Sequence, residues 1–100
     1  MKSLRDPKRK PTHPGAILRE DVLPALEMTQ TEFARRLGVS RLTVSELLLE
    51  KRALSADMAM RIGRLTRTTP EGWLRMQEAL DLWTLAQEPG RYEDIEPVAA

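Results

Sequence analysis

The sequence of 100 residues contains no cysteine and a single histidine, His13. Without cysteine, neither a disulfide framework nor a zinc site with thiolate ligands is possible. One histidine supplies no convincing Ser-His-Asp set, and no glycine-rich phosphate loop or cluster of metal ligands is present. We therefore expect no enzymatic activity, no small-molecule substrate, no cofactor and no metal. His13 stands beside Pro14 at a helix start, where a capping or loop role fits it.

Aromatic residues and long apolar runs are also scarce. Aromatic residues make up only 4% of the chain, so its core must be largely aliphatic. The basic N-terminal stretch MKSLRDPKRK is not followed by an apolar run. We therefore expect neither a signal peptide nor a transmembrane segment, and a cytoplasmic protein. The length predicts one domain, and a chain this short buries so modest a share of its surface that dimerisation would help it.

The net charge is only +1, but the two ends of the chain have opposite signs. Residues 1–12 carry five lysines or arginines against one aspartate, and residues 88–100 carry four carboxylates against one arginine. We expect a flexible basic arm and a flexible acidic tail on either side of a domain at residues 13–87. The arm either follows DNA phosphates or is simply solvated.

Local signals divide residues 13–87 into five helices without a strand. Each expected helix begins next to a residue that suits a helix start: His13, Thr29, Ser40, Ser55 and Thr69. Pro24 is expected to end or kink the first helix near Leu23. Gly38 ends the second, the third runs from about residue 41 to 50, and the fifth runs to about Gln87. The fold class is therefore all-α, with five helices joined by short connections.

Residues 30–49, QTEFARRLGVSRLTVSELLL, have the pattern of a helix-turn-helix. Ala34 stands where two helices must approach closely, Gly38 provides the turn, and Ser40 can cap the next helix. Apolar residues fall at positions that would bury both helices against each other: Phe33, Leu37, Val39, Val44 and Leu47. In this motif the second helix presents a polar face to the major groove of DNA.

The third helix has side chains free for base contacts, because Val44, Leu47 and Leu48 face inward. Arg41 can hold a guanine edge with two hydrogen bonds, and Leu42 can press on a thymine methyl. Ser45 can bond a base or a phosphate. Glu46 either accepts a hydrogen bond from cytosine or only orients Arg41.

Further residues surround this helix at positions suited to phosphate contacts. They are Gln30, Thr31, Thr43, Lys51 and Arg52. Arg35 and Arg36 on the second helix either flank the groove or serve as solubilising charge. The alternative for all these residues is that they form only a solvated helix face and make no contact with DNA.

The fifth helix is apolar on two sides. One stripe is the natural core face: Trp73, Met76, Leu80 and Trp83. The other stripe is displaced around the helix: Leu74, Leu82 and Leu85. A helix that is apolar on two sides must bury both. The second stripe is either a dimer surface, which we favour, or part of a tightly wrapped monomer. A two-fold dimer would place two recognition helices roughly 34 Å apart and bind a palindromic operator.

Three stretches together resemble the HigA-type antitoxins of bacterial toxin–antitoxin modules, within the Cro/phage-repressor (XRE-like) helix-turn-helix group. They are HPGAILREDVLPAL, QTEFARRLGVSRLTVSELL and KRALSADMAMRIGRLTRTTPEGWLRMQEALDLW, and the resemblance covers about residues 13–84. It implies a five-helix, lambda-repressor-like domain that dimerises, binds its own operator and neutralises a HigB-type ribonuclease toxin. The motif carries over these groove residues: Gln30, Ser40, Arg41, Leu42, Thr43, Ser45 and Glu46.

The chain departs from this family at one turn. Many members have Asn-Gly after the third helix, where this chain has Leu49-Glu50. A negative Glu50 near the DNA backbone counts against the phosphate contact expected there. Two alternatives therefore stay open: a stand-alone repressor without a toxin partner, and a protein-interaction module that has lost DNA binding, which Glu46 and Glu50 would favour.

Overall fold

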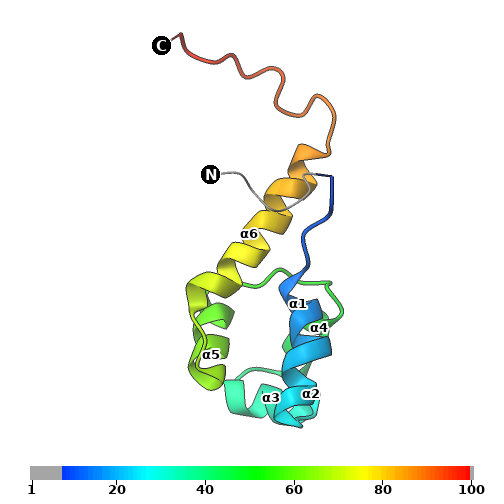
Figure 1. Ribbon diagram of the computed structural model, residues 1–100, viewed down its shortest axis with the longest axis vertical. Coiled ribbons are helices and arrows are strands. Elements are labelled where there is room, and N and C mark those ends of the chain that lie inside the picture. Colours follow the sequence, from blue (N-terminus) through cyan, green and yellow to red (C-terminus); the bar gives the residue numbers. More distant parts are fainter. Residues whose placement is uncertain (1–7, 100) are drawn as a thin grey trace.

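The computed structural model describes residues 8–99 and contains helices connected by short turns (Figure 1). In chain order the elements are α1 (Pro14–Ile17), the π-helical turn η1 (Leu18–Val22), α2 (Leu23–Leu26), α3 (Gln30–Leu37), α4 (Arg41–Leu48), α5 (Ala56–Thr66) and α6 (Pro70–Ala86). The first three elements follow one another without a break and form one helix. The predicted all-α class with five helices is thus confirmed for residues 8–99. Most of the predicted basic arm, residues 1–7, lies outside the described residues.

Every helix begins with a side-chain cap at the residue that the sequence indicated. The caps accept hydrogen bonds from backbone N–H groups two or three residues later: His13 from Gly15 at 2.9 Å, Thr29 from Glu32 at 3.1 Å, Ser40 from Thr43 at 3.0 Å, Ser55 from Met58 at 3.1 Å and Thr69 from Gly72 at 3.3 Å. Each cap satisfies one of the donors that the first turn of a helix leaves unpaired. The predicted role of His13 as a cap is confirmed.

Of the two effects predicted for Pro24, an end of the first helix near Leu23 is not found, because the helix continues to Leu26. The residues before the proline adopt a π-helical turn, in which the Leu23 N–H bonds to the Leu18 carbonyl five residues back. This wider turn accommodates a residue that lacks an N–H donor. The helix ends instead where Glu27 takes a left-handed conformation, with φ at 54°.

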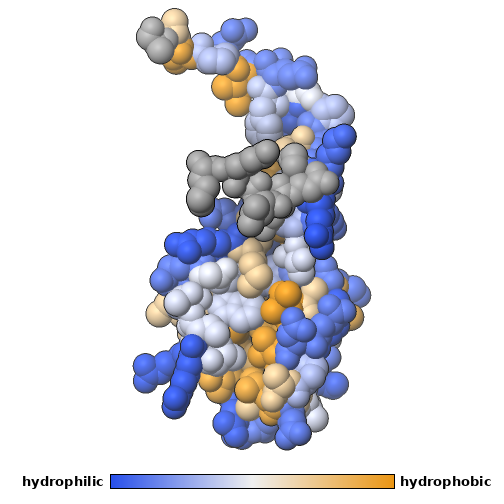
Figure 2. All heavy atoms as spheres, in the orientation of Figure 1, coloured by the Kyte–Doolittle hydropathy of each residue, from blue (hydrophilic) through white to orange (hydrophobic). Residues whose placement is uncertain are grey.

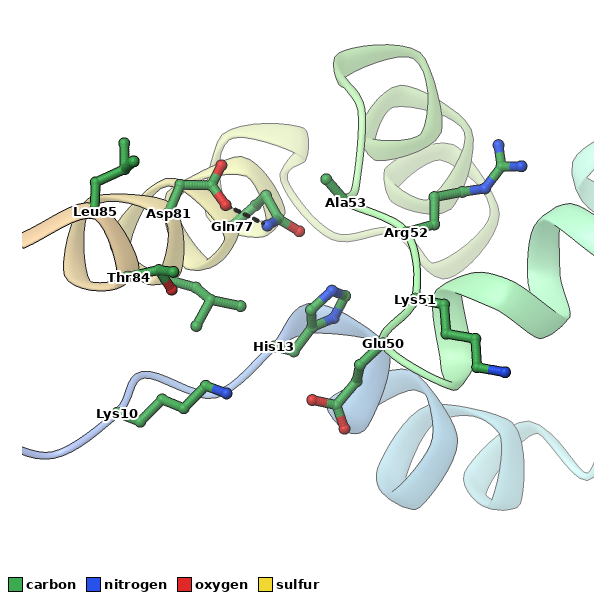
Figure 3. Close-up of a pocket in the computed structure, with 11 residues that line it drawn as sticks. Lys10, His13, Glu50, Lys51, Arg52, Ala53, Gln77, Asp81, Thr84 and Leu85 are labelled. Atoms are coloured by element: carbon green, nitrogen blue, oxygen red, sulfur yellow. Dashed lines mark hydrogen bonds between the residues drawn. The ribbon is translucent and has the colours of Figure 1, made fainter. Parts of the chain in front are cut away.

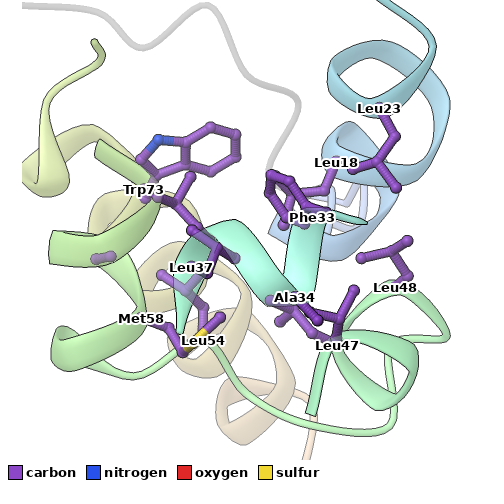
Figure 4. Close-up of a cluster of buried hydrophobic side chains, with 13 residues drawn as sticks. Leu18, Leu23, Phe33, Ala34, Leu37, Leu47, Leu48, Leu54, Met58 and Trp73 are labelled. Carbon is purple, nitrogen blue, oxygen red and sulfur yellow. The ribbon is translucent and has the colours of Figure 1, made fainter. Parts of the chain in front are cut away.

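The core lies where the first helix, α3, α4 and α5 meet (Figure 4). Phe33 on α3, Leu18 on the π turn and Ile62 on α5 are completely buried, and Leu47 on α4 is 1% exposed. Apart from Phe33 and Trp73, the buried cluster is aliphatic, as the composition predicted. α3 packs against α4, α5 packs against α3 and α6, and α1 packs against α4. The helix-turn-helix pair, α3 and α4, is therefore packed against α5 through α3 and against α1 through α4.

The longest helix, α6, packs on the core at its beginning and then runs clear of the body, so that residues 88–99 project from the molecule (Figure 1). Trp73 and Leu80 are buried on one face, and the polar Gln77 is buried between them. Gln77 accepts a hydrogen bond from the Leu54 N–H at 2.8 Å and donates one to Asp81 at 2.8 Å. No helix within residues 8–99 has the length and apolar character that crossing a membrane requires.

Candidate nucleic-acid interface

One face of α4 is open to solvent along its whole length. Arg41 and Leu42 are exposed, Leu42 by 66%, and Ser45 and Glu46 are half-buried. The opposite face is packed into the core by Val44, Leu47 and Leu48, as predicted. The structure thus brings the predicted base-contacting side chains together on one surface.

The turn between α3 and α4 fixes the angle at which α4 leaves the core. Gly38 has φ of 74°, a left-handed conformation that favours glycine. The Val39 N–H then bonds to the Ala34 carbonyl at 3.1 Å, which closes the end of α3. Ser40 follows and also contacts Thr43, with 2.9 Å between the two hydroxyl oxygens. The hydroxyls of Ser40 and Thr43 are therefore held together at the start of α4.

Glu46 forms an ion pair with Arg52, at 2.7 Å between Oε1 and Nη2. Glu46 therefore does not orient Arg41, which was one of the two roles considered for it; its carboxylate is paired with Arg52 instead. The side chain of Arg41 makes no hydrogen bond or ion pair with any residue in the range 8–99. Its guanidinium remains available, whereas the charge of Arg52 is largely balanced by Glu46. Lys51 beside it is exposed.

Arg19 on the π turn holds the other end of α4. Its Nη1 donates to the Leu48 carbonyl at 2.6 Å and lies 3.2 Å from the Glu50 carboxylate. A cation at this end is favoured by the helix dipole and satisfies an unpaired carbonyl. α4 ends at Leu48 rather than near residue 50, because Glu50 adopts a left-handed conformation with φ of 62°.

Glu50 therefore takes a backbone conformation that asparagine and glycine adopt with less strain. Its negative charge is partly balanced by Arg19, since the two side chains form the ion pair described above. The sequence alone gave no means of finding this pairing, because Arg19 and Glu50 are 31 residues apart.

At the start of α3, Thr31 is exposed and Gln30 is half-buried, so both lie at a helix N-terminus open to solvent. Further along, Glu32 accepts hydrogen bonds from Arg35 at 2.6 Å and from Arg36 at 3.1 Å. These two arginines lower the pKa of Glu32 to about 2. Since one carboxylate balances only part of two guanidinium charges, this side of α3 stays positive.

A cavity of about 630 Å³ lies between the segment before α1, the loop after α4, and α6 (Figure 3). His13, Asp81 and Thr84 all line it, which invites comparison with a catalytic set. Their hydrogen bonds indicate structural roles instead. His13 Nδ1 accepts from the Gly15 N–H, and Asp81 accepts from the buried Gln77. Within residues 8–99, no group of three or more potential metal ligands is present.

The three candidate dimer residues of α6 have different surroundings. Leu74 is partly buried against the core cluster, and Leu85 is half-buried and lines the cavity beside His13. Leu82 is 64% exposed. Of the second stripe, Leu82 is thus the residue most available to another molecule.

Two capped helices joined at a left-handed glycine, with one exposed and one buried face on the second helix, define a helix-turn-helix protein. The helix-turn-helix family matches residues 18–73, and the chain belongs to this family. That membership supports a regulatory protein rather than an enzyme.

Particular relatives narrow the comparison. The uncharacterized HTH-type transcriptional regulator YbaQ of Escherichia coli K12 is 37% identical over 92% of this chain and 87% of its own length. Antitoxin HigA-1 of Vibrio cholerae is 36% identical over 80% of this chain and 75% of its own. The resemblance to HigA-type antitoxins is thereby confirmed.

Solved structures give the same result. Antitoxin GraA in complex with its operator has a TM-score of 0.83 and 38% identity, covering 98% of this chain and all of that one. Antitoxin HigA of Pseudomonas aeruginosa with the higBA promoter has a TM-score of 0.81 and 37% identity, covering 90% of this chain and all of that one.

Proposed function

We propose that this chain is a sequence-specific DNA-binding repressor that acts as the antitoxin of a HigBA-type module. The observation that carries the proposal is the exposed face of α4, held by Ser40 at one end and Arg19 at the other. A helix fixed at both ends presents its side chains in one geometry, which base-specific contacts require. Relatives of the same fold bound to operator or promoter DNA support it.

On this proposal, Arg41 contacts a guanine and Leu42 a thymine methyl, while Ser45 and Glu46 contact neighbouring positions. Arg52 acts on Glu46 and fixes the direction of its carboxylate, since the two are joined at 2.7 Å. Phosphate contacts come from residues around the helix: Gln30, Thr31, Ser40, Thr43 and Lys51.

We further propose that two copies associate through α6, with Leu82 at the contact and Leu74 and Leu85 beside it. Two-fold association places two copies of α4 in successive major grooves, so the operator is palindromic. The protein would then repress its own operon and bind a HigB-like ribonuclease toxin through a protein surface. Because DNA is the proposed partner of this helix-turn-helix domain, we expect the protein in the cytoplasm.

The alternative of an interaction module without DNA binding has less support. Its two negative residues, Glu46 and Glu50, are each paired with an arginine, so neither presents an unbalanced charge to DNA. A stand-alone repressor differs from an antitoxin only in its partner. A reading frame for a small ribonuclease beside the gene, and its product in the purified complex, would separate these two.

The decisive test of DNA binding is a competition assay at moderate salt. Duplex from upstream of the gene should compete at least about a thousandfold better than shuffled duplex of equal length, as specific sites generally do. Equal competition by the two duplexes would remove the proposal.

A further inference from the structure

A second positively charged site lies between the end of α3 and the second half of α5, around a hollow of about 430 Å³. It is lined by Arg36, Leu37, Arg61, Arg64, Leu65 and Arg67. Four of these six residues are arginines, and the two leucines give the hollow an apolar part. We call it the arginine hollow.

The arginine hollow holds more positive charge than its neighbours balance. Arg61 pairs with Asp57 at 2.8 Å, and Arg36 shares Glu32 with Arg35. Arg64 and Arg67 are exposed, and their side chains form no hydrogen bond or ion pair with residues 8–99.

Five arginines and two carboxylates in this region thus leave three positive charges, in a chain whose total is +1. Such a concentration attracts anionic groups, and the planar fork of arginine fits carboxylates well.

The acidic tail, residues 88–99, has the complementary character. Four carboxylates and one arginine give it three negative charges. Tyr92, Ile95 and Val98 are 48%, 69% and 93% exposed, and the tail shows isolated apolar side chains between hydrophilic ones (Figure 2). The hydrogen bonds of residues 88–95 stay within the tail or reach only the last turn of α6. Nothing in the described chain covers these side chains.

We propose that the acidic tail of one copy binds in the arginine hollow of a second copy of this chain. Carboxylates of Glu93 and Asp94 pair with Arg64 and Arg67, and an apolar tail residue packs against Leu65. Arginine clusters are a recurring means of recognising acidic segments. Here the two charges are equal in size and opposite in sign, and both partners also offer apolar surface.

The length of α6 favours a second copy over the same one. The hollow includes Arg67, just before α6 begins, and the tail follows the end of α6. The 17 residues of α6 span about 25 Å. A tail that returned along its own helix would use about eight extended residues to cover this distance. These eight, residues 87–94, include Glu88, Glu93 and Asp94, which are three of the four carboxylates of the tail. A tail from another molecule has no such limit.

DNA is the rival occupant, because arginines also bind phosphates. The hollow lies at the carboxyl-terminal end of α3, whereas Gln30 and Thr31 lie at its amino-terminal end, where phosphates are expected. α5, which supplies most of the hollow, packs mainly on α3 and α6 rather than on α4. Both facts favour a protein partner over a DNA phosphate in the hollow.

Binding in the hollow would act close to the recognition helix. Arg61 donates to the carbonyl of Leu37 at 2.8 Å and to that of Gly38 at 3.5 Å, immediately before α4 begins. The proposal therefore predicts self-association that weakens with salt and occurs next to the DNA-reading element.

The test adds a synthetic peptide of residues 87–99 to the dilute, isotope-labelled full chain and follows backbone amides by NMR. We expect saturable shifts at the end of α3 and in the second half of α5. Arg64→Glu should weaken peptide binding about tenfold, because it places like charges together. Arg64 is exposed and unpaired, so this variant should fold normally, which its unfolding curve will verify. Lys51→Glu, at an exposed lysine outside the hollow, is the matched control and should bind as the wild type does.

A reversed peptide tests the pairing directly. A peptide with Glu93→Lys and Asp94→Lys should bind the wild type weakly and regain binding to the Arg64→Glu chain. Absence of shifts, shifts centred on Lys51 and Arg52, or equal binding by the Arg64→Glu chain would overturn the proposal. It would also be overturned if Arg64→Glu weakened operator binding and left peptide binding unchanged, because the hollow would then be a phosphate site.

Discussion

The backbone of Gly15 lies directly against the carbonyl of Leu47. A Cβ atom added at Gly15 would be 1.9 Å from the Leu47 oxygen and 2.9 Å from its carbonyl carbon. Residue 15 is in the first turn of α1, and Leu47 is in the last turn of α4. The two backbones can approach this closely only because no side chain separates them. This contact sets how deeply the recognition helix sits in the fold.

Gly15→Ala should therefore destabilise the protein, although alanine is ordinarily the better helix former. The backbone of α1 or α4 must move, and we expect a loss of about 1–3 kcal/mol in the free energy of unfolding. Urea denaturation measures it. Gly72→Ala is the control, because the nearest atom there is the Thr69 hydroxyl at 3.0 Å, a side-chain atom, so no backbone has to move and at most the Thr69 cap of α6 is weakened. Equal effects of the two substitutions would show that the close approach is unimportant.

Arg41→Ala should weaken operator binding by about 1–3 kcal/mol, or roughly 5- to 150-fold, and relax the preference at one base pair. Arg41 is exposed and unpaired within residues 8–99, so the loss would reflect DNA contact rather than folding. Fluorescence anisotropy and selection from random sequence measure the two effects. Arg64→Ala serves as the control and should leave the affinity unchanged. An unaltered binding motif would remove Arg41 as a base reader.

Glu46→Ala should change how the protein responds to salt. Without its carboxylate partner at 2.7 Å, Arg52 is free to pair with a phosphate. One added phosphate contact steepens the dependence of log affinity on log salt by about 0.9, while preference at one base pair declines. Titrations at several salt concentrations give the slope. A double variant that also carries Arg52→Ala should lose the added steepness, and an unchanged slope in Glu46→Ala would argue against the ion pair in the free protein.

Leu82→Glu should reduce self-association through α6 and, with it, cooperative operator binding. Leu82 is 64% exposed, so the monomer should tolerate the charge, which a contact between two copies would not. Sedimentation equilibrium at high salt, where tail binding is weak, measures the dimer. Leu26→Glu is the control: it places the same charge on α2, away from α6, where the leucine is 39% exposed, and should leave the mass unchanged. If only the control lowered the mass, the dimer surface would lie elsewhere.

The Glu32 carboxylate should make stability depend on acid. Its pKa falls from 4.5 to about 2 in the folded chain, first because of hydrogen bonds from Arg35 and then Arg36. A lowered pKa means that the ionised form stabilises the fold above pH 4.5, and this contribution disappears as the pH falls towards 2. Thermal unfolding of wild type and Glu32→Gln should converge over that range. Because the group is exposed, salt should shrink the difference, and parallel curves throughout would contradict the assignment.

Much of the fold could be predicted from local sequence. The caps at Thr29, Ser40 and Ser55 act within three residues of themselves, so short spacing is sufficient to indicate them. The buried face of α4 follows from helical periodicity in the same way. The π turn before Pro24 could not be read from such patterns, because a proline inside a helix ordinarily indicates an end or a kink.

The candidate site was only partly accessible to the same reasoning. Arg41 and Leu42 were predicted to be exposed, since the core side of their helix was already filled. The ion pair of Glu46 with Arg52 was not predicted, because Arg52 lies in the loop beyond the helix. The burial of Gln77 could have been predicted, because this residue falls between Trp73 and Leu80 on one helical face. Its hydrogen bond to Leu54 could not, because the two residues are 23 positions apart in the sequence.

The sequence by itself determined where helices begin, which faces are apolar and which class of motif they form, since these depend on neighbours within about one turn. Only the tertiary structure decided that Arg19 closes the end of α4, that Gly15 admits the Leu47 carbonyl, and that four arginines surround one hollow. These contacts join residues far apart in the chain. They arise only when packing the apolar faces fixes the distances between helices, and local spacing carries no information about those distances.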